Sequence, residues 1–183
     1  MTFEYAPAPE SRSVVNLASS YGLFISGEFV DGTGSSFKSI SPATEEVLAE
    51  VAEATEADVD RAVAAARRAF TGTWSTMRGS ERAKYLYRIA RILQERSREL
   101  AVLESLDNGK PIRESRDVDL PLVAAYFFYY AGWADKLEYA SPAWQPTNGR
   151  GGAPAPLGVA AQIIPWNFPL LMLARKLAPA LAC

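Results

Sequence analysis

The stretch Ile163-Ile164-Pro165-Trp166-Asn167-Phe168-Pro169 decides the fold, because it joins an apolar run to a helix through a proline-bounded loop. Upstream, Val159 to Ile164 is a short, nearly continuous apolar run, which is typical of a strand buried on both faces. Downstream, residues 170–182 predict a helix with Pro169 at its first position. Strand, loop and helix in this order form half of a βαβ crossover, so the sequence predicts an α/β fold.

Within this loop, Asn167 carries the one side chain that offers two amide donors. In open α/β sheets, ligands bind beyond the carboxyl ends of the strands, close to helix N-termini. An amide placed there can stabilise an oxyanion that develops on a carbonyl substrate. The alternative is that Asn167 caps the helix that follows, and local physics alone favours the cap.

The residues before this stretch predict a strand-rich part followed by helices. A hairpin with a Gly-containing turn is expected over residues 23–30, and short strands over 37–51, around the Ser41-Pro42 break. Thr55 and Asp58 form a capping-box pattern at the start of a helix that runs to Phe70.

Two further helices are expected beyond that point. One continuous helical pattern runs from Ser80 to Asn108, where Gly109 and Pro111 end it. Another covers 115–137, interrupted or begun near Pro121, and its dense aromatic run predicts packing between helices.

Composition excludes several classes of function. The 183 residues contain 19 Lys+Arg and 21 Asp+Glu, so no basic field favours nucleic acid or an anionic membrane. The absence of histidine removes Ser-His and Cys-His catalytic pairs and His-based zinc sites. The single cysteine allows neither an internal disulfide nor a Cys metal cluster, so we expect no metal site and a cytoplasmic, reducing location. No signal peptide and no membrane-spanning segment are expected.

Several separate strings, in the same order, resemble the NAD(P)-dependent aldehyde dehydrogenase superfamily. The central string 163–172 looks like a signature of that family. Residues 23–30 resemble its opening hairpin, Ser41-Pro42-Ala43-Thr44 its Asn-Pro-Ala-Thr turn, and residues 52–70 its first helix. The strings 106–111 and 129–136 match as well. The resemblance runs from about Tyr21 to Cys183, and it implies an incomplete Rossmann-like cofactor-binding domain with an N-terminal hairpin and helices.

The resemblance also implies roles for individual residues. Asn167 would hold the oxyanion of the thiohemiacetal formed when a catalytic cysteine attacks an aldehyde. Ile164, Pro165 and Trp166 would line the NAD or NADP cleft, largely through backbone contacts. Phe168 and Met172 would border the aldehyde channel.

The nucleophilic cysteine and the general-base glutamate of the family lie far downstream of the matched region. Cys183 matches a position before the next strand and is not expected to be the nucleophile. We therefore expect the N-terminal part of an aldehyde dehydrogenase that is inactive alone. The alternative is a non-catalytic interaction module that pairs with a homologous or complementary aldehyde dehydrogenase chain.

The domain organisation follows from these matches. We expect a flexible arm over residues 1–20 and the first part of the cofactor domain over 21–138. The Pro- and Gly-rich segment 139–157 is expected to be a degenerate oligomerisation segment, and 158–183 the truncated start of the parallel sheet.

Overall fold

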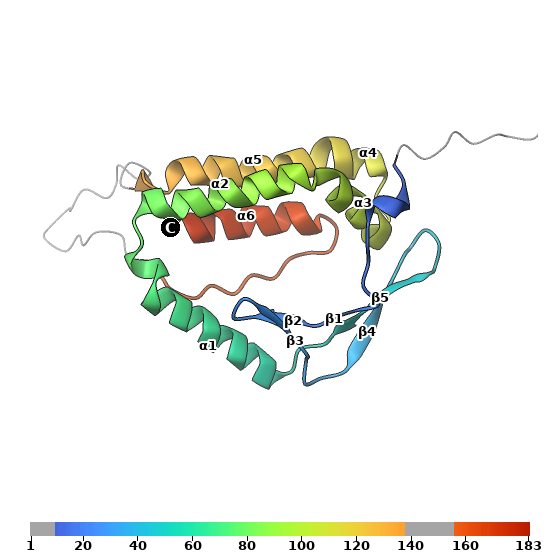
Figure 1. The fold of residues 1–183 in the computed structure, drawn as a ribbon, viewed down its shortest axis with the longest axis horizontal. Coiled ribbons are helices and arrows are strands. Elements are labelled where there is room, and N and C mark those ends of the chain that lie inside the picture. The colour runs from blue at the N-terminus through green and yellow to red at the C-terminus, as the bar shows by residue number, and fades with distance from the viewer. Residues whose placement is uncertain (1–9, 138–155) are drawn as a thin grey trace, which may run out of the picture.

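The computed structural model describes residues 10–137 and 156–183. Its core lies between three helices that run side by side: α2 (Gly79–Glu95), α5 (Leu120–Trp133) and α6 (Pro169–Ala182) (Figure 1). Alanines at the α6 contact, which include Ala174 and Ala178, let this helix approach its neighbours closely. The predicted C-terminal helix with proline at its first position is confirmed.

The strands form two small sheets on the other side of the molecule (Figure 1). Strands β2 (Leu23–Ile25) and β3 (Glu28–Val30) make the expected hairpin, in which Ser26 and Gly27 both have positive φ. Strands β4 (Ser36–Ile40) and β5 (Val47–Ala52) pair antiparallel, and β1 (Ser20–Tyr21) adds to β5 in parallel. The predicted hairpin and short strands are therefore confirmed.

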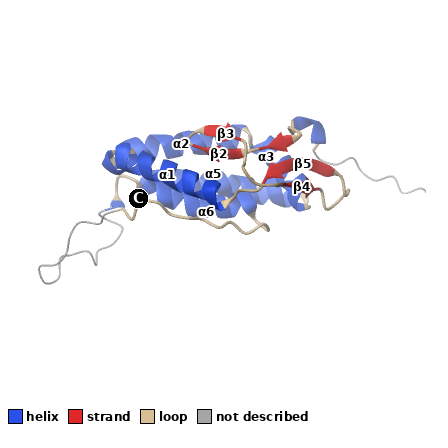
Figure 2. Ribbon diagram, turned by 90° about the horizontal axis from the view of Figure 1, so that it is seen from below, coloured by secondary structure: helices blue, strands red, loops and turns tan. Residues whose placement is uncertain are grey.

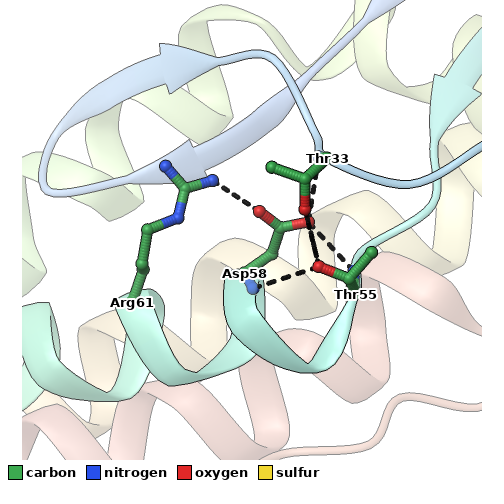
Figure 3. Close-up of polar contacts among 4 residues, drawn as sticks. All are labelled: Thr33, Thr55, Asp58 and Arg61. Carbon is green, nitrogen blue, oxygen red and sulfur yellow. Dashed lines mark hydrogen bonds and ion pairs between the residues drawn. The ribbon is translucent and has the colours of Figure 1, made fainter.

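Helix α1 (Glu56–Gly72) begins at the predicted capping box. The Asp58 carboxylate accepts hydrogen bonds from the backbone N–H groups of Thr33 and Thr55, and it pairs with Arg61 at 2.5 Å (Figure 3). Thr33 lies in the turn between β3 and β4, so these contacts fix the start of α1 against that turn. The hydrogen bond from Thr55 and the pairing with Arg61 hold the pKa of Asp58 far below its ordinary value.

Asp58→Asn is expected to lower the stability of the chain at pH 7, because it removes the ionised acceptor. A depressed carboxyl pKa gives stability that is present above the unfolded value, 3.8, and is lost as pH falls through the folded value. The difference between the two proteins should therefore shrink below about pH 4. Urea unfolding from pH 7 to pH 2 measures this, with exposed Asp60→Asn as the matched control. A difference that does not change with pH would contradict the assignment.

The long helix expected over 80–108 is wrong, because the pattern divides into α2 and α3 (Ser97–Asn108) at Arg96. Arg96 leaves helical geometry at φ −99° and ψ 12°, which interrupts the helix between Glu95 and Ser97. The expected end of α3 is confirmed, since Gly109 adopts the left-handed conformation at φ 78°.

The third expected helix is also divided. A short turn of helix, α4 (Ile112–Glu114), leads through a π-helical turn (Ser115–Asp119) into α5, which ends at Trp133. The wider π turn brings both Ser115 and Asp119 into the interior. Phe127 of the aromatic run is buried in the helical core, as predicted.

The predicted strand over 159–164 is wrong for this structure. These residues cross the molecule as an extended segment between α1 and α6, and the described residues supply no strand to pair with them (Figures 1 and 2). Ile163 is 91% exposed. A strand needs neighbours for its backbone hydrogen bonds, so an apolar run without such a neighbour stays outside a sheet.

Two of the expected segments lie partly outside the described residues. Of the expected arm 1–20, residues 10–20 are described, and Glu10 pairs with Arg98 at 2.5 Å, which attaches this part to α3. Most of the expected segment 139–157 is not described.

Candidate functional site: the Pro165–Phe168 loop and its supports

The loop between the extended segment and α6 carries most of the residues singled out by the sequence. Pro165, Trp166 and Asn167 are exposed, and Trp166 has 80% of its surface accessible. Phe168 is the N-cap residue of α6, and its carbonyl accepts the Met172 N–H at 2.8 Å. The structure therefore brings Asn167, Phe168 and Met172 together at the N-terminal end of α6, while Ile164 lies half-buried just before the loop.

Asn167 does not cap the helix. The N-cap position belongs to Phe168, and no side chain makes a capping hydrogen bond there. Among the contacts of the described residues, the Asn167 amide has no hydrogen-bond partner. The capping interpretation is therefore wrong, and the amide donors remain available to a ligand beside the positive end of the helix dipole.

Two residues on one turn hold the loop on either side of Asn167. Asn108 donates from Nδ2 to the Trp166 carbonyl at 2.6 Å. The Lys110 ammonium lies 4.0 Å from the centre of the Phe168 ring, within range of a cation–π interaction. Sequence reasoning missed both contacts, because partners 58 residues apart leave no local pattern.

Lys110 is itself held in a buried ionic cluster. Its ammonium is 3.1 Å from Glu104 Oε1 and 2.5 Å from Asp119 Oδ2, and its side chain is only 9% exposed. Burial raises the pKa of Glu104, because it disfavours the charged carboxylate more than Lys110 favours it. Burial opposes the Lys110 charge as well, yet the hydrogen bonds to Asp119 and Glu104 raise the pKa of Lys110 above its ordinary value.

The backbone around Lys110 is fixed by two further contacts. Ser105 Oγ donates to the Lys110 carbonyl at 2.6 Å. Gly109 has φ 78°, and a Cβ there would approach Pro42 Cγ to 2.9 Å, so the turn fits closely against the β4–β5 connection. The turn 108–110, which contacts the Asn167 loop, is thus held rigidly by Ser105 and Pro42.

A second feature is an apolar cleft of about 520 Å³ between α1, the extended segment and α6. It is lined mainly by apolar side chains, both aliphatic and aromatic, among them Ala66, Phe70, Trp74, Val159 and Leu177. Leu157 at the start of the extended segment is completely exposed. The cleft and the unpaired segment present apolar surface that nothing among the described residues covers.

An extended apolar segment that leads through an amide-bearing loop to the N-terminus of a helix has the chain order of half a βαβ unit, which is a building block of α/β enzyme domains. The aldehyde dehydrogenase family model matches residues 29–183. The chain belongs to the aldehyde dehydrogenase family, and the predicted family is confirmed.

Relatives and solved structures agree with this assignment. The chain is 48% identical to Arabidopsis thaliana aldehyde dehydrogenase family 2 member B4, mitochondrial, over 88% of this chain and 30% of that protein. It is similar to a crystal structure of indole-3-acetaldehyde dehydrogenase, at 37% identity and a TM-score of 0.80, over 93% of this chain and 40% of that one. The NAD⁺ complex of Bacillus cereus aldehyde dehydrogenase matches at 39% identity and a TM-score of 0.74, over 89% and 34% of the two chains.

These comparisons confirm the fold class as a partial Rossmann-like aldehyde dehydrogenase fold. The chain spans about a third of the length of the curated relatives it matches. Within the described ranges, none of the helices combines the length and the apolar character needed to cross a bilayer.

Proposed function

We propose that this chain forms the N-terminal part of an aldehyde dehydrogenase that oxidises an aldehyde to a carboxylic acid with NAD⁺ or NADP⁺. The single observation that carries the proposal is the free amide of Asn167 beside the N-terminus of α6. The Asn167 amide donates a hydrogen bond to the oxyanion of the thiohemiacetal, and the positive end of the helix dipole adds to that stabilisation.

The neighbouring residues contact the two reactants. Phe168 and Met172 border the aldehyde channel with an aromatic ring and a flexible thioether. Ile164, Pro165 and Trp166 line the cofactor cleft. The family relationship and the Bacillus cereus NAD⁺ complex support a nicotinamide cofactor.

The exposed segment fits part of a cofactor contact surface. The Trp166 ring is open to solvent, and no described residue bonds to the carbonyls of Ile164 and Pro165. These groups offer a flat apolar contact and free backbone acceptors to a dinucleotide. When bound, the nicotinamide accepts the hydride that leaves the substrate carbon.

The chain alone is proposed to be inactive, because its one cysteine is misplaced for the chemistry. Asn167 precedes α6, whereas Cys183 follows its last residue. A helix of 14 residues is about 20 Å long. The Cys183 thiol therefore cannot attack a substrate carbonyl whose oxygen is hydrogen-bonded to the Asn167 amide. The nucleophile is therefore contributed by another residue of the whole enzyme, and the general base is the glutamate that the family resemblance places downstream.

The second candidate is a non-catalytic module that pairs with a homologous or complementary aldehyde dehydrogenase chain. The apolar cleft and the unpaired segment 159–164 favour this second candidate, because their apolar surface can be removed from solvent only by a partner. The proposed location remains the cytoplasm.

A chimera tests the proposed function. Residues 1–183 are fused to the part of Bacillus cereus aldehyde dehydrogenase that follows the matched third, and aldehyde-dependent NADH formation is measured. We expect turnover by the chimera and none by the 183-residue chain. A folded, NAD⁺-binding chimera without turnover would contradict the proposed function, and turnover by the chain alone would contradict its proposed inactivity.

A further inference from the structure

We propose that Asn108 and Lys110 are positioning residues that hold the Asn167 amide in one orientation through the backbone and ring of its two neighbours. This inference rests on the proposed role of Asn167 as the oxyanion donor. It adds two residues to the site, on a turn that contacts neither reactant in that proposal.

The first step is that the loop has little support of its own. Pro165 and Pro169 bound it and lack N–H groups, and Trp166 and Asn167 are both exposed. An exposed side chain without a partner samples several rotamers, and ordering it costs free energy when a ligand binds. An oxyanion donor works only if it is already in place, so the loop requires support from elsewhere.

The second step is that the α3 end supplies this support on both sides of Asn167. The bond from Asn108 Nδ2 fixes the carbonyl of Trp166, which belongs to the peptide unit shared with Asn167. The Lys110 ammonium fixes the ring of Phe168, the residue that follows Asn167. The peptide plane before Asn167 is thereby held directly and the residue after it is held through its ring, which restricts the backbone from which the Asn167 side chain projects.

The third step is that the supporting turn is more rigid than the loop. Lys110 lies between two buried carboxylates, and Gly109 packs against Pro42. A buried charge held by two partners provides a fixed anchor for the ring of Phe168.

The test uses the 183-residue chain with ¹⁵N labelling, and it measures order at the backbone amides of 166–168 and at the Asn167 side-chain amide. In the unmodified chain we expect order parameters near 0.85 at the three backbone amides, the value typical of a rigid backbone. Asn108→Ala should lower these order parameters below about 0.6. Phe168→Leu should lower them by the same amount at positions 167 and 168. Phe168→Tyr keeps an aromatic ring at this position and should keep the order. Lys110 is not substituted in this test, because its loss would disturb the buried ionic cluster as well as the Phe168 ring.

Two controls are measured in each variant: the free energy of unfolding in urea, and the order parameters of the α6 backbone amides after Met172. Loss of order confined to 166–168, with α6 unchanged, supports positioning. Unchanged order in Asn108→Ala and Phe168→Leu, or a uniform loss throughout α6, would overturn it. Because loop order is measured without catalysis, failure of this inference is distinct from failure of the proposed function, which the chimera reports.

Discussion

Lys110→Met is expected to reduce the free energy of unfolding by about 3–5 kcal/mol, as found when one partner of a buried ion pair is removed. Methionine has a similar length and no charge, so the substitution keeps the side-chain volume while it removes the cation. Glu104 and Asp119, which are 3% and 1% exposed, would then share the interior with no cation between them. Urea unfolding at pH 7, followed by circular dichroism, measures the loss.

Two variants separate the missing charge from the missing contacts. Glu104→Gln leaves Lys110 paired with Asp119, so we expect a much smaller effect than for Lys110→Met. The raised pKa of Glu104 means that the native chain loses stability as pH rises above the ordinary value of 4.5. Glu104→Gln removes that slope, and its stability relative to the native chain should improve from pH 4.5 upward. If Lys110→Met lowered the free energy of unfolding by less than about 1 kcal/mol, the ionic cluster would contribute no more than an exposed ion pair.

Local signals were sufficient for those elements that depend on local contacts. The Thr55 and Asp58 capping box, the Ser26-Gly27 turn and the Gly109 stop each rest on residues within a few positions of one another. Their geometry is therefore specified by backbone preference and short-range hydrogen bonds. The start of α6 at Pro169 follows the same rule.

Predictions failed where distant residues decide the outcome. The apolar run over 159–164 predicts a strand, but strand formation depends on a neighbouring strand that the run itself cannot encode. The division of the 80–108 pattern at Arg96 is likewise not marked by the apolar positions, which continue without a break. The π turn places Asp119 beside Lys110, and no pattern in sequence marks that change of register.

The candidate site shows the same division. Asn167 was found because an amide between a proline-bounded loop and a helix is a recognisable local arrangement. Its supports are not predictable in the same way, since Asn108 and Lys110 in the sequence indicate only the end of a helix. The one available signal was a lysine and an asparagine beside a glycine stop, which is compatible with many surface turns.

Asn167→Ala in the chimera is expected to reduce kcat by about 10²–10³-fold, the cost of removing one oxyanion donor. The substrate carbonyl carries little charge in the ground state, and the oxyanion develops only on attack, so KM should change much less than kcat. Steady-state rates of NADH formation measure this, with the exposed Asn16→Ala as the control that removes an amide elsewhere. Because the Asn167 side chain bonds to no described residue, its loss should leave the unfolding midpoint unchanged, which separates catalysis from folding. A variant with unchanged kcat would exclude Asn167 as the donor, even if the loop proves rigid and the chimera turns over. If the fall in kcat were accompanied by a fall in the unfolding midpoint, Asn167 would have a structural role instead.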